Sequence, residues 1–377
     1  MSYLFLERNQ ALSSNNRREK DNYMITMPYK SCAPSSGEVT PRPTMAQVAV
    51  LAGVGIKTVS RVVNGEPYVS EKLTKRVQSA IEQLNYRPNL HAGTLRSKNA
   101  KDVSIGLLIS NVADPYSGAV HRGIEDVARE HNAAVFASSL DDDPQRERSS
   151  IDAFLQRRLD ALILTAVAPS QGYLATEQKH GTKLIFIDRI PRGIEADTVV
   201  SDNYKGACTA THHLIIHGHK RLAYLGDRQK ITTAQDRRQG FLDTIGRAGI
   251  ASANIPVIEN LDNEEKARLA VHELMGQPIP PTALFTARNL VTIGAFRALR
   301  ELELQHHIAL VGFDDIPLSD LLEPAITVIT QDPGRIGALA AQRAFARLAG
   351  DDSPAQKFIV PTRLITRGSG EIPAPKA

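Results

Sequence analysis

A short segment, residues 55–63, carries side chains that could read DNA. Val59, Val62 and Val63 recur at helical spacing and form its apolar face. The opposite face presents a mixed and partly basic set, namely Ile56, Lys57, Ser60 and Arg61. An outward face of this kind suits reading of the major groove, and a plain three-helix bundle with no nucleic-acid role is the alternative that the pattern leaves open.

The positive charge of the chain is concentrated around this segment. The whole chain of 377 residues has a formal net charge of only +4. Between residues 43 and 98 there are eight Lys and Arg against three Glu and no Asp, a surplus of five positive charges. Such a concentration favours contact with a phosphate backbone, and a solvated basic surface is the alternative.

Three short helices are expected to position these side chains. Thr44 and Gln47 have the spacing of a capping box, and Gly53 supplies the turn that ends the first helix. Asn64-Gly65 marks the turn after the second helix. Ser70 can cap a third helix, whose inward stripe is Leu73, Val77, Ile81 and Leu84.

From residue 103 onward, short apolar runs alternate with helical segments. The strand candidates are Val103–Ile109, Ala134–Ala137, Ala161–Thr165, Lys183–Ile187, Arg221–Leu225, Ala283–Thr286 and Ile308–Phe313. The helical candidates include Ser117–Glu130, Ser149–Arg158, Tyr204–His217, Ala234–Ala248, Glu264–Met275 and Asn289–Leu304. Continuous apolar runs are typical of parallel strands that are covered on both faces. The alternation therefore predicts the α/β class, with doubly wound parallel sheets.

The sequence argues against several other classes. It has no run approaching the roughly 18 apolar residues of a membrane span, and residues 1–10 lack the apolar core of a signal peptide, so we expect a cytoplasmic protein. Residues 1–42 are rich in Ser, Asn, Arg and Pro, and we expect a disordered extension there. Cys32 and Cys208 cannot form a zinc site alone, and a structural disulfide is not expected.

We also expect no enzyme activity and no cofactor. The chain contains no phosphate loop of the P-loop type, and we find no catalytic constellation. A group of histidines (His212, His213, His217 and His219) could suggest a metal site. Their places on or at the end of a helix favour capping and surface roles instead, so we predict no metal.

Several runs of residues together resemble one protein family. Near the N-terminus these are TMAQVAVLAGVGIKTVSRVVNG at 44–65, YVS at 68–70, NYRPN at 85–89 and LRS at 95–97. Further runs are VSIGLLI at 103–109, DPY at 114–116, IFIDR at 185–189, GHKRLAYLG at 218–226 and VGFDD at 311–315. This pattern resembles the lactose repressor/galactose repressor (LacI/GalR) family of transcription regulators over nearly all of the chain from residue 44 onward.

The resemblance implies a helix-turn-helix DNA-binding domain followed by a two-lobed core like that of periplasmic binding proteins. We expect the domain at 43–88, a hinge helix and linker at 89–101, and the effector-binding and dimerisation core at 102–377. The N-lobe would comprise about 102–201 and 333–360, and the C-lobe about 202–332 and 361–370.

The resemblance also implies residue roles in DNA binding. Ile56 and Lys57 would read base edges, with Arg61 as a further base contact. Thr44, Ser60 and Asn64 would position phosphates. In the hinge, Leu95 would wedge into the minor groove, whereas an ordinary apolar linker residue is the alternative for it. Gly55 stands where the family usually has Ser, which puts that backbone contact in doubt. Gly93 replaces a better helix former in the hinge.

In the core, the resemblance implies a small-molecule site at the carboxyl ends of strands, in the cleft between the lobes. Tyr116 would stack on the ligand, and hydrogen bonds would come from Thr165, Asp188, Arg237, Asp314 and Gln331. Carboxylates and an Arg fork suit a polyhydroxylated ligand. Alternatives remain for three of these: a surface salt bridge for Arg237, capping of a turn for Asp314, and an internal salt bridge with Arg189 for Asp188.

One position departs from the family at this site. Arg288 and Asn289 follow the Ala283–Thr286 strand, where the family often has Asn-Asp. Arg288 would either close the pocket or select an acidic ligand, such as a sugar acid or a sugar phosphate.

We therefore expect a repressor that binds a near-palindromic operator in double-stranded DNA as a homodimer, or as a tetramer. A sugar, sugar acid or sugar phosphate would release or enhance operator binding. The rival hypotheses are a sugar-binding protein without DNA function and an enzyme on the same scaffold.

Overall fold

The computed structural model of the protein describes residues 25–28, 43–63, 69–86, 103–251 and 255–376. Asn64, Leu95 and the expected hinge therefore lie outside the described residues. By its internal contacts the core separates into two units, one made of 103–198 and 333–355 and the other of 199–332 and 356–377.

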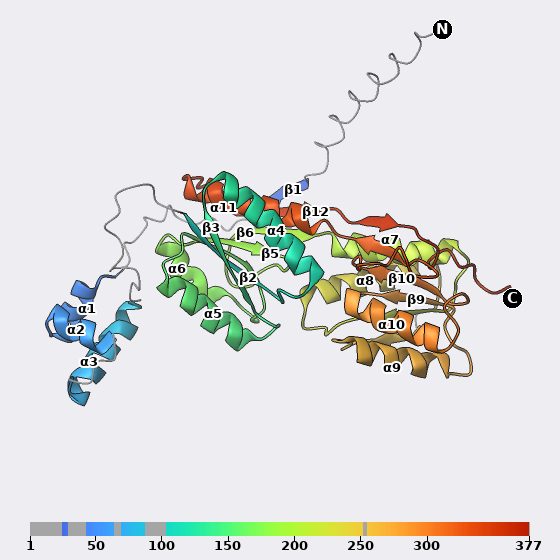
Figure 1. The fold of residues 1–377 in the computed structure, drawn as a ribbon, viewed down its shortest axis with the longest axis horizontal. Helices are drawn as coiled ribbons and strands as arrows, with labels where there is room; N and C mark the ends of the chain where they lie inside the picture. Colours follow the sequence, from blue (N-terminus) through green and yellow to red (C-terminus); the bar gives the residue numbers. More distant parts are fainter. Residues whose placement is uncertain (1–24, 29–42, 64–68, 87–102, 252–254, 377) are drawn as a thin grey trace, which may run out of the picture. The chain divides into compact units, whose positions relative to one another are not determined.

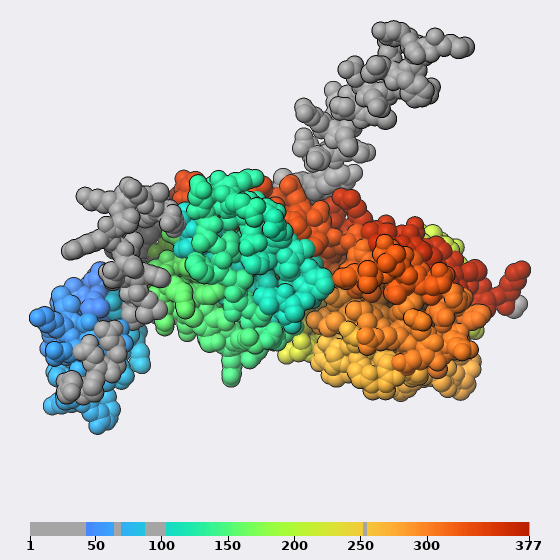
Figure 2. All heavy atoms as spheres, in the orientation of Figure 1, coloured from blue at the N-terminus to red at the C-terminus, as the bar shows by residue number. Residues whose placement is uncertain are grey.

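The N-terminal helices α1 (Met45–Ala52), α2 (Ile56–Val63) and α3 (Glu71–Leu84) surround one small core. Their atoms form one contiguous group, coloured blue in Figure 2. The buried residues of this core are Val48, Ala49, Ala52, Val59, Val77, Ala80 and Tyr86. The predicted capping box is present at Thr44, and Gly53 ends α1 with a left-handed φ of 60°. Ser70 precedes α3 as predicted, but its side chain makes no capping hydrogen bond.

The first core unit contains a parallel sheet in the order β3-β2-β4-β5. These strands are β2 (Ser104–Ile109), β3 (Ala134–Ser139), β4 (Ala161–Thr165) and β5 (Lys183–Ile187). Figure 1 shows α4 (Pro115–Glu130) and α11 (Pro333–Leu348) over one face and α5 (Pro144–Gln156) and α6 (Ala175–Lys179) over the other. Side chains on both faces of β2, β4 and β5 are buried, as the continuous apolar runs predicted, whereas the edge strand β3 is exposed or half-buried along its length.

Helices α4 and α11 pack against each other at unusually short range. A Cβ added to Gly337 would lie 2.1 Å from the carbonyl oxygen of Val120, and one added to Gly123 would lie 2.3 Å from that of Gly334. Glycine is needed at both positions because only a hydrogen atom fits between the two backbones.

The strand β6 (Asp197–Ser201) is absent from our sequence predictions. It begins with a charged residue, Asp197, whose side chain is fully buried. Arg343 and Arg347 of α11 both donate to this carboxylate, at 3.0 and 2.9 Å. A buried carboxylate is tolerated here because two guanidinium groups compensate it.

The second core unit holds a sheet in the order β13-β11-β10-β9-β7-β8. Its strands are β7 (Leu222–Leu225), β8 (Val257–Ile258), β9 (Ala283–Thr286), β10 (Ala309–Phe313), β11 (Thr327–Thr330) and β13 (Arg363–Ile365). Only β13 runs antiparallel to its neighbour in this sheet. The sheet lies between α7 (Asn203–Ile216) with α8 (Thr232–Arg247) and α9 (Glu264–Met275) with α10 (Asn289–Glu301) (Figure 1).

Two separate hydrophobic cores fill the two faces of this sheet. In β9, Phe285 belongs to the core under α7 and α8, whereas Leu284 belongs to the core under α9 and α10. Alternate residues of one strand therefore serve opposite cores, which is why the strand reads as a continuous apolar run. The α/β class with parallel sheets, predicted from the alternation, is confirmed.

One region departs from the expected organisation. Residues 25–28, expected to be disordered, form the strand β1 (Ile25–Pro28), which pairs antiparallel with β12 (Gln356–Val360). The backbone of β12 supplies hydrogen-bonding partners that the sequence of residues 1–42 alone cannot reveal. By their internal contacts, residues 356–360 group with 199–332, and the expected lobe bounds stay a prediction. A hydrogen bond of 3.0 Å from the amide of Asp202 to the carbonyl of Val360 is part of that connection.

Candidate functional site

The geometry of α1 and α2 is that of a helix-turn-helix. The chain bends by 105° between them, across residues 53–55. Helix-turn-helix pairs have bends of about 90–120° across a short turn that often contains Gly. Arg76 of α3 fixes this turn because it donates to the carbonyl of Ala52 at 2.7 Å.

The outward face of α2 carries the side chains that were predicted to read bases. Ile56 is 54% exposed, whereas Val59 is fully buried in the core of the three helices. Lys57 and Arg61 are exposed one helical turn apart, and Ser60 is half-buried. A short helix with an exposed apolar and basic face is able to enter a major groove.

The role predicted for Thr44 overlaps with a structural one. Its Oγ1 accepts a hydrogen bond from the amide of Gln47 at 3.3 Å, and its own amide donates to Gln47 Oε1 at 2.7 Å. Thr44 remains exposed, so phosphate positioning by this residue stays a prediction.

None of the described helices has, by itself, the length and apolar character to cross a membrane. Helices α1 and α2 reach those measures only when they are counted together despite their bend.

In the first core unit, the predicted ligand residues lie at the carboxyl edge of the sheet. Thr165 is buried at the end of β4, and Asp188 follows β5 with a φ of 65°. Tyr116 is the second residue of α4, where its amide donates to the capping carboxylate of Asp114 at 3.0 Å. Parallel strands bring these positions to one edge, as expected for α/β sheets.

The internal salt bridge that rivalled a ligand role for Asp188 is present. Arg189 lies 3.4 Å from the Asp188 carboxylate and 2.7 Å from that of Asp142. The ligand role of Asp188 therefore stays a prediction, and its charge is already compensated within the unit.

A buried glutamate that the sequence reading missed supports the loop after Thr165. Glu147 of α5 accepts hydrogen bonds from the amides of Val167 and Ala168 at 2.5 and 2.7 Å. It also accepts one from the hydroxyl of Tyr173 at 2.6 Å. Burial first, and then the hydrogen bond to Glu147, raise the pKa of Tyr173. The only sequence signal for Glu147 is its place in the first turn of an amphipathic helix.

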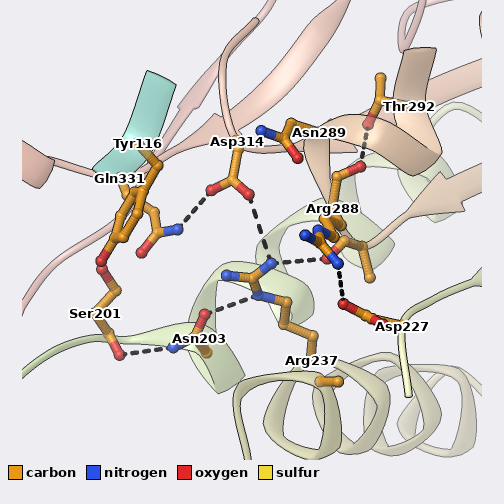
Figure 3. Close-up of polar contacts among 12 residues, drawn as sticks. Tyr116, Ser201, Asn203, Asp227, Arg237, Arg288, Asn289, Thr292, Asp314 and Gln331 are labelled. Carbon is orange, nitrogen blue, oxygen red and sulfur yellow. Dashed lines mark hydrogen bonds and ion pairs between the residues drawn. The ribbon is translucent and has the colours of Figure 1, made fainter. Parts of the chain in front are cut away.

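In the second core unit, four predicted residues lie close together at the carboxyl edge of the sheet (Figure 3). Arg288 follows β9, Asp314 follows β10 and Gln331 follows β11, while Arg237 comes from α8. Gln331 Nε2 donates to the Asp314 carboxylate. The Asp314 backbone has a φ of 73°, in the left-handed region that Asp tolerates better than most residues.

Arg237 is the centre of this group and is not on the surface. Its Nε donates to Asn203 Oδ1 at 2.8 Å, and its Nη1 donates to the carbonyl of Ala287 at 2.7 Å. Nη1 also lies 3.7 Å from the Asp314 carboxylate, and the guanidinium stacks on the Phe313 ring at 3.7 Å. The surface salt bridge considered for Arg237 is therefore wrong, because the strand ends bury this side chain.

Arg288 makes a contact that the sequence did not predict. Its Nη1 donates to the carboxylate of Asp227, the second residue after β7. Arg228 approaches the same carboxylate, with its Nε 3.6 Å from Oδ1. Asp227 and Arg288 are 61 positions apart in the chain, so local sequence patterns gave no sign of the pair.

Two polar atoms of this group make no hydrogen bond in the described part of the chain, one on Ser201 at the end of β6 and one on Gln331 after β11. Ser201 and Gln331 are both more than nine-tenths buried. Neither Ser201 Oγ nor Gln331 Oε1 has a hydrogen-bond partner within the described residues. Since buried polar atoms are nearly always bonded, these two are suited to the hydroxyl groups of a ligand.

The histidines near residue 215 have structural contacts. His219 is fully buried between the hydroxyl of Thr282 at 2.9 Å and the carbonyl of Ile372 at 2.8 Å. His213 is also buried and lies 2.6 Å from Glu371. The surface roles expected for these two residues are wrong, because the segment around residues 371–374 packs over them. Across the part of the chain that the structure describes, no cluster of metal-ligand side chains occurs.

Comparison with known proteins identifies the same two kinds of domain as the geometry. Residues 44–89 match the model for bacterial regulatory proteins of the lacI family, and residues 211–370 match the periplasmic binding protein-like domain. The HTH-type transcriptional regulator GalR of Escherichia coli K12 is 31% identical over 89% of this chain and 97% of its own.

Two solved structures are similar over most of the chain. One is the Lac repressor dimer bound to operator and the anti-inducer ONPF, 25% identical with a TM-score of 0.65, covering 88% of this chain and 99% of the other. The other is the complex of transcriptional regulator CelR with cellobiose, also 25% identical, with a TM-score of 0.64 and coverage of 87% and 100%. With its helix-turn-helix and its periplasmic-binding-protein-like core, this chain belongs to the lacI family of bacterial transcription regulators.

Proposed function

We propose that this protein is a repressor that binds a near-palindromic operator as a homodimer, and that a small carbohydrate changes its operator affinity. The observation that carries the DNA-binding half is the 105° helix pair with Ile56, Lys57 and Arg61 exposed on α2. Similarity to an operator-bound Lac repressor dimer supports it. A protein that reads bacterial DNA acts where the DNA lies, so we place it in the cytoplasm.

The first experiment is selection of random duplex DNA by the purified full-length protein at about 150 mM salt, near physiological ionic strength. We expect a near-palindrome whose half-sites reflect the two-fold symmetry of the dimer. Lys57→Ala and Arg61→Ala should each lose about 1–3 kcal/mol of operator binding, with relaxed base preference at the position each side chain reads. Lys205→Ala changes an exposed lysine in α7 and should bind like the parent protein. Enrichment of no sequence by folded protein would contradict the proposal.

The effector half of the proposal rests on the polar group around Arg237. This group offers the Arg237 fork, the carboxylates of Asp227 and Asp314, and the unpaired oxygens of Ser201 and Gln331. Together these groups can bind a molecule with several hydroxyl groups. Similarity to a regulator in complex with cellobiose supports a carbohydrate. Because the chain has no Trp, calorimetric titration is a better assay than intrinsic fluorescence.

The mechanism requires two states of the regulator with different affinities for the effector. The effector shifts the population toward the state that it binds more tightly, and operator affinity changes by the same coupling factor. Titrating effector against operator-bound protein shows whether the effector raises or lowers operator affinity. A receptor with no DNA role would bind the carbohydrate without any operator, and an enzyme would convert it.

The dimer surface that we propose includes exposed leucines of the second core unit. Leu269 of α9, Leu318 and Leu321 are all exposed, although they extend from segments that pack on one shared core. If these leucines form one patch, that patch is a candidate contact surface. Leu321→Asp should give monomers in sedimentation velocity, whereas the same change at exposed Ile279 should leave the dimer intact. Dimers in the Leu321 variant would place the interface elsewhere.

A further inference from the structure

Three arginines lie close together at the carboxyl edge of the second sheet. Arg228 and Arg288 share the carboxylate of Asp227, and Arg237 lies near that of Asp314. The neighbouring Arg238 pairs instead with Glu259 at 2.7 Å. A site lined by several guanidinium groups selects ligands by charge as well as by shape.

Arg288 is a cation that a ligand can reach. Its side chain is 23% exposed, compared with 8% for Arg237 and 29% for Arg228. Arg237 is held on several sides, whereas the side chain of Arg288 bonds to the Asp227 carboxylate. Arg288 is also the residue that precedes the first turn of α10, and its side chain makes no capping bond there. The positive end of a helix of 13 residues therefore adds to the guanidinium charge at this point.

We propose that the effector is an anionic carbohydrate, with a carboxylate or a phosphate that Arg288 binds in exchange for Asp227. This inference rests on the proposed carbohydrate effector and specifies its charge. Gln331 Oε1 and Ser201 Oγ bind hydroxyl groups of the sugar, while Arg288 binds the anion. An Arg fork suits both anions, because each presents two oxygens at matching spacing.

Asp227 makes the exchange energetically feasible. Breaking a buried ion pair is costly when one partner is left without compensation. Here Arg228 lies 3.6 Å from the same carboxylate, so Asp227 keeps a cation when Arg288 turns to the ligand. Asp227 consequently acts as a competitor of the ligand, and it excludes neutral sugars that cannot replace its charge on Arg288.

Two substitutions should change anion binding in opposite directions. Arg288→Asn removes the anion contact and should weaken binding of the acidic ligand by about tenfold or more, the range for truncating a buried charged hydrogen bond. Asp227→Asn removes the competitor and should strengthen binding of the same ligand by up to about tenfold. Arg288→Lys keeps the charge but not the fork, and should retain part of the preference. Arg238→Asn is the matched control and should change nothing.

The test is calorimetric titration of the full chain with matched sets of ligands. Each set contains a pentose or hexose, its aldonic and uronic acids and its terminal phosphate ester. The parent protein should bind at least one charged member about tenfold or more tightly than the neutral sugar, since an ion pair at a partly buried site is less screened than one at the surface. The acids and the phosphate esters distinguish a carboxylate from a phosphate ligand.

The possible failures separate the two proposals. Preference for the neutral sugar, or an acid preference unchanged in Arg288→Asn, would overturn the charge inference and leave the carbohydrate effector in place. Binding of no member of any set would overturn the carbohydrate effector and the charge inference with it. A gain in Asp227→Asn cannot result from misfolding, so this variant keeps the test decisive if Arg288→Asn folds poorly.

Discussion

Two adjacent arginines of α8 have very different surroundings. Arg237 is buried among Asn203, the carbonyl of Ala287 and Asp314, whereas Arg238 is more exposed and pairs with Glu259. Arg237→Lys keeps one charge but loses the planar fork, so effector binding should weaken by about tenfold or more. Arg238→Lys, next to it, should bind effector normally. Calorimetry on the two variants measures this difference, and equal losses would mean that α8 rather than the fork is responsible.

His219 makes the stability of the protein depend on pH. Burial lowers the pKa of its imidazole below the ordinary 6.5, and outweighs the hydrogen bond to Ile372, which raises it. As the pH falls below 6.5 toward this lowered pKa, the unfolded chain binds more protons than the folded one. The free energy of unfolding should therefore be highest above that range and decrease as the pH falls through it.

Urea unfolding of parent and His219→Gln proteins at several pH values between 8 and 5 checks this prediction. The variant should lose the part of the pH dependence that comes from this imidazole. An identical slope in both proteins would mean that other groups cause the whole effect.

At the scale of elements, the contact between α4 and α11 tolerates no side chain at its centre. An alanine at Gly337 would bring its Cβ to 2.1 Å from the backbone oxygen of Val120, which can move only with the helix. Gly337→Ala should destabilise the protein by about 1–3 kcal/mol, as overpacking does. Gly118→Ala, also in α4, meets nothing within 4 Å and should stabilise the helix by up to about 1 kcal/mol. Thermal unfolding of both variants compares them directly.

The elements that the sequence predicted correctly are those with a local signal. The strands β4, β5 and β9 have the predicted bounds, because each is a buried apolar run covered on both faces. The strand β6 had no such signal. It starts at the charged Asp197, and the arginines that compensate this carboxylate lie about 150 positions further along the chain. The β1 pairing with β12 likewise depends on a distant partner strand.

In the candidate site too, contacts between residues distant in the sequence could not be predicted. Family resemblance identified Arg237, Arg288, Asp314 and Gln331, and the structure brings them together at one sheet edge. The resemblance gave no indication of Asn203, which orients Arg237, or of Asp227, which pairs with Arg288. Both are polar residues at the starts of loops or helices, where capping alone would explain them. Their role depends on which strand ends become neighbours, and that information lies in the topology of the sheet.

At the scale of the whole molecule, operator binding and dimerisation should be linked. A dimer neutralises phosphates at two half-sites, and the logarithm of affinity decreases with the logarithm of salt concentration by about 0.9 for each phosphate contacted. The Leu321→Asp variant, if monomeric, should therefore show about half the salt slope of the parent protein on the same operator. Fluorescence anisotropy at a series of salt concentrations measures both slopes. An unchanged slope in a monomeric variant would contradict two-fold binding.

Helix α11 lies late in the sequence but belongs to the first core unit, which has a consequence for synthesis on the ribosome. Helices α1 to α3 are complete once residue 86 has emerged from the ribosome, and the described residues of their core all lie between 45 and 86. The unit that begins at residue 103 has to wait for residues 333–355, because α11 covers β4 and β5 and compensates Asp197. A nascent chain therefore carries a finished DNA-reading domain while its sensor is still incomplete. Ribosomes that stall before residue 355 would release a DNA-binding fragment that no effector could control.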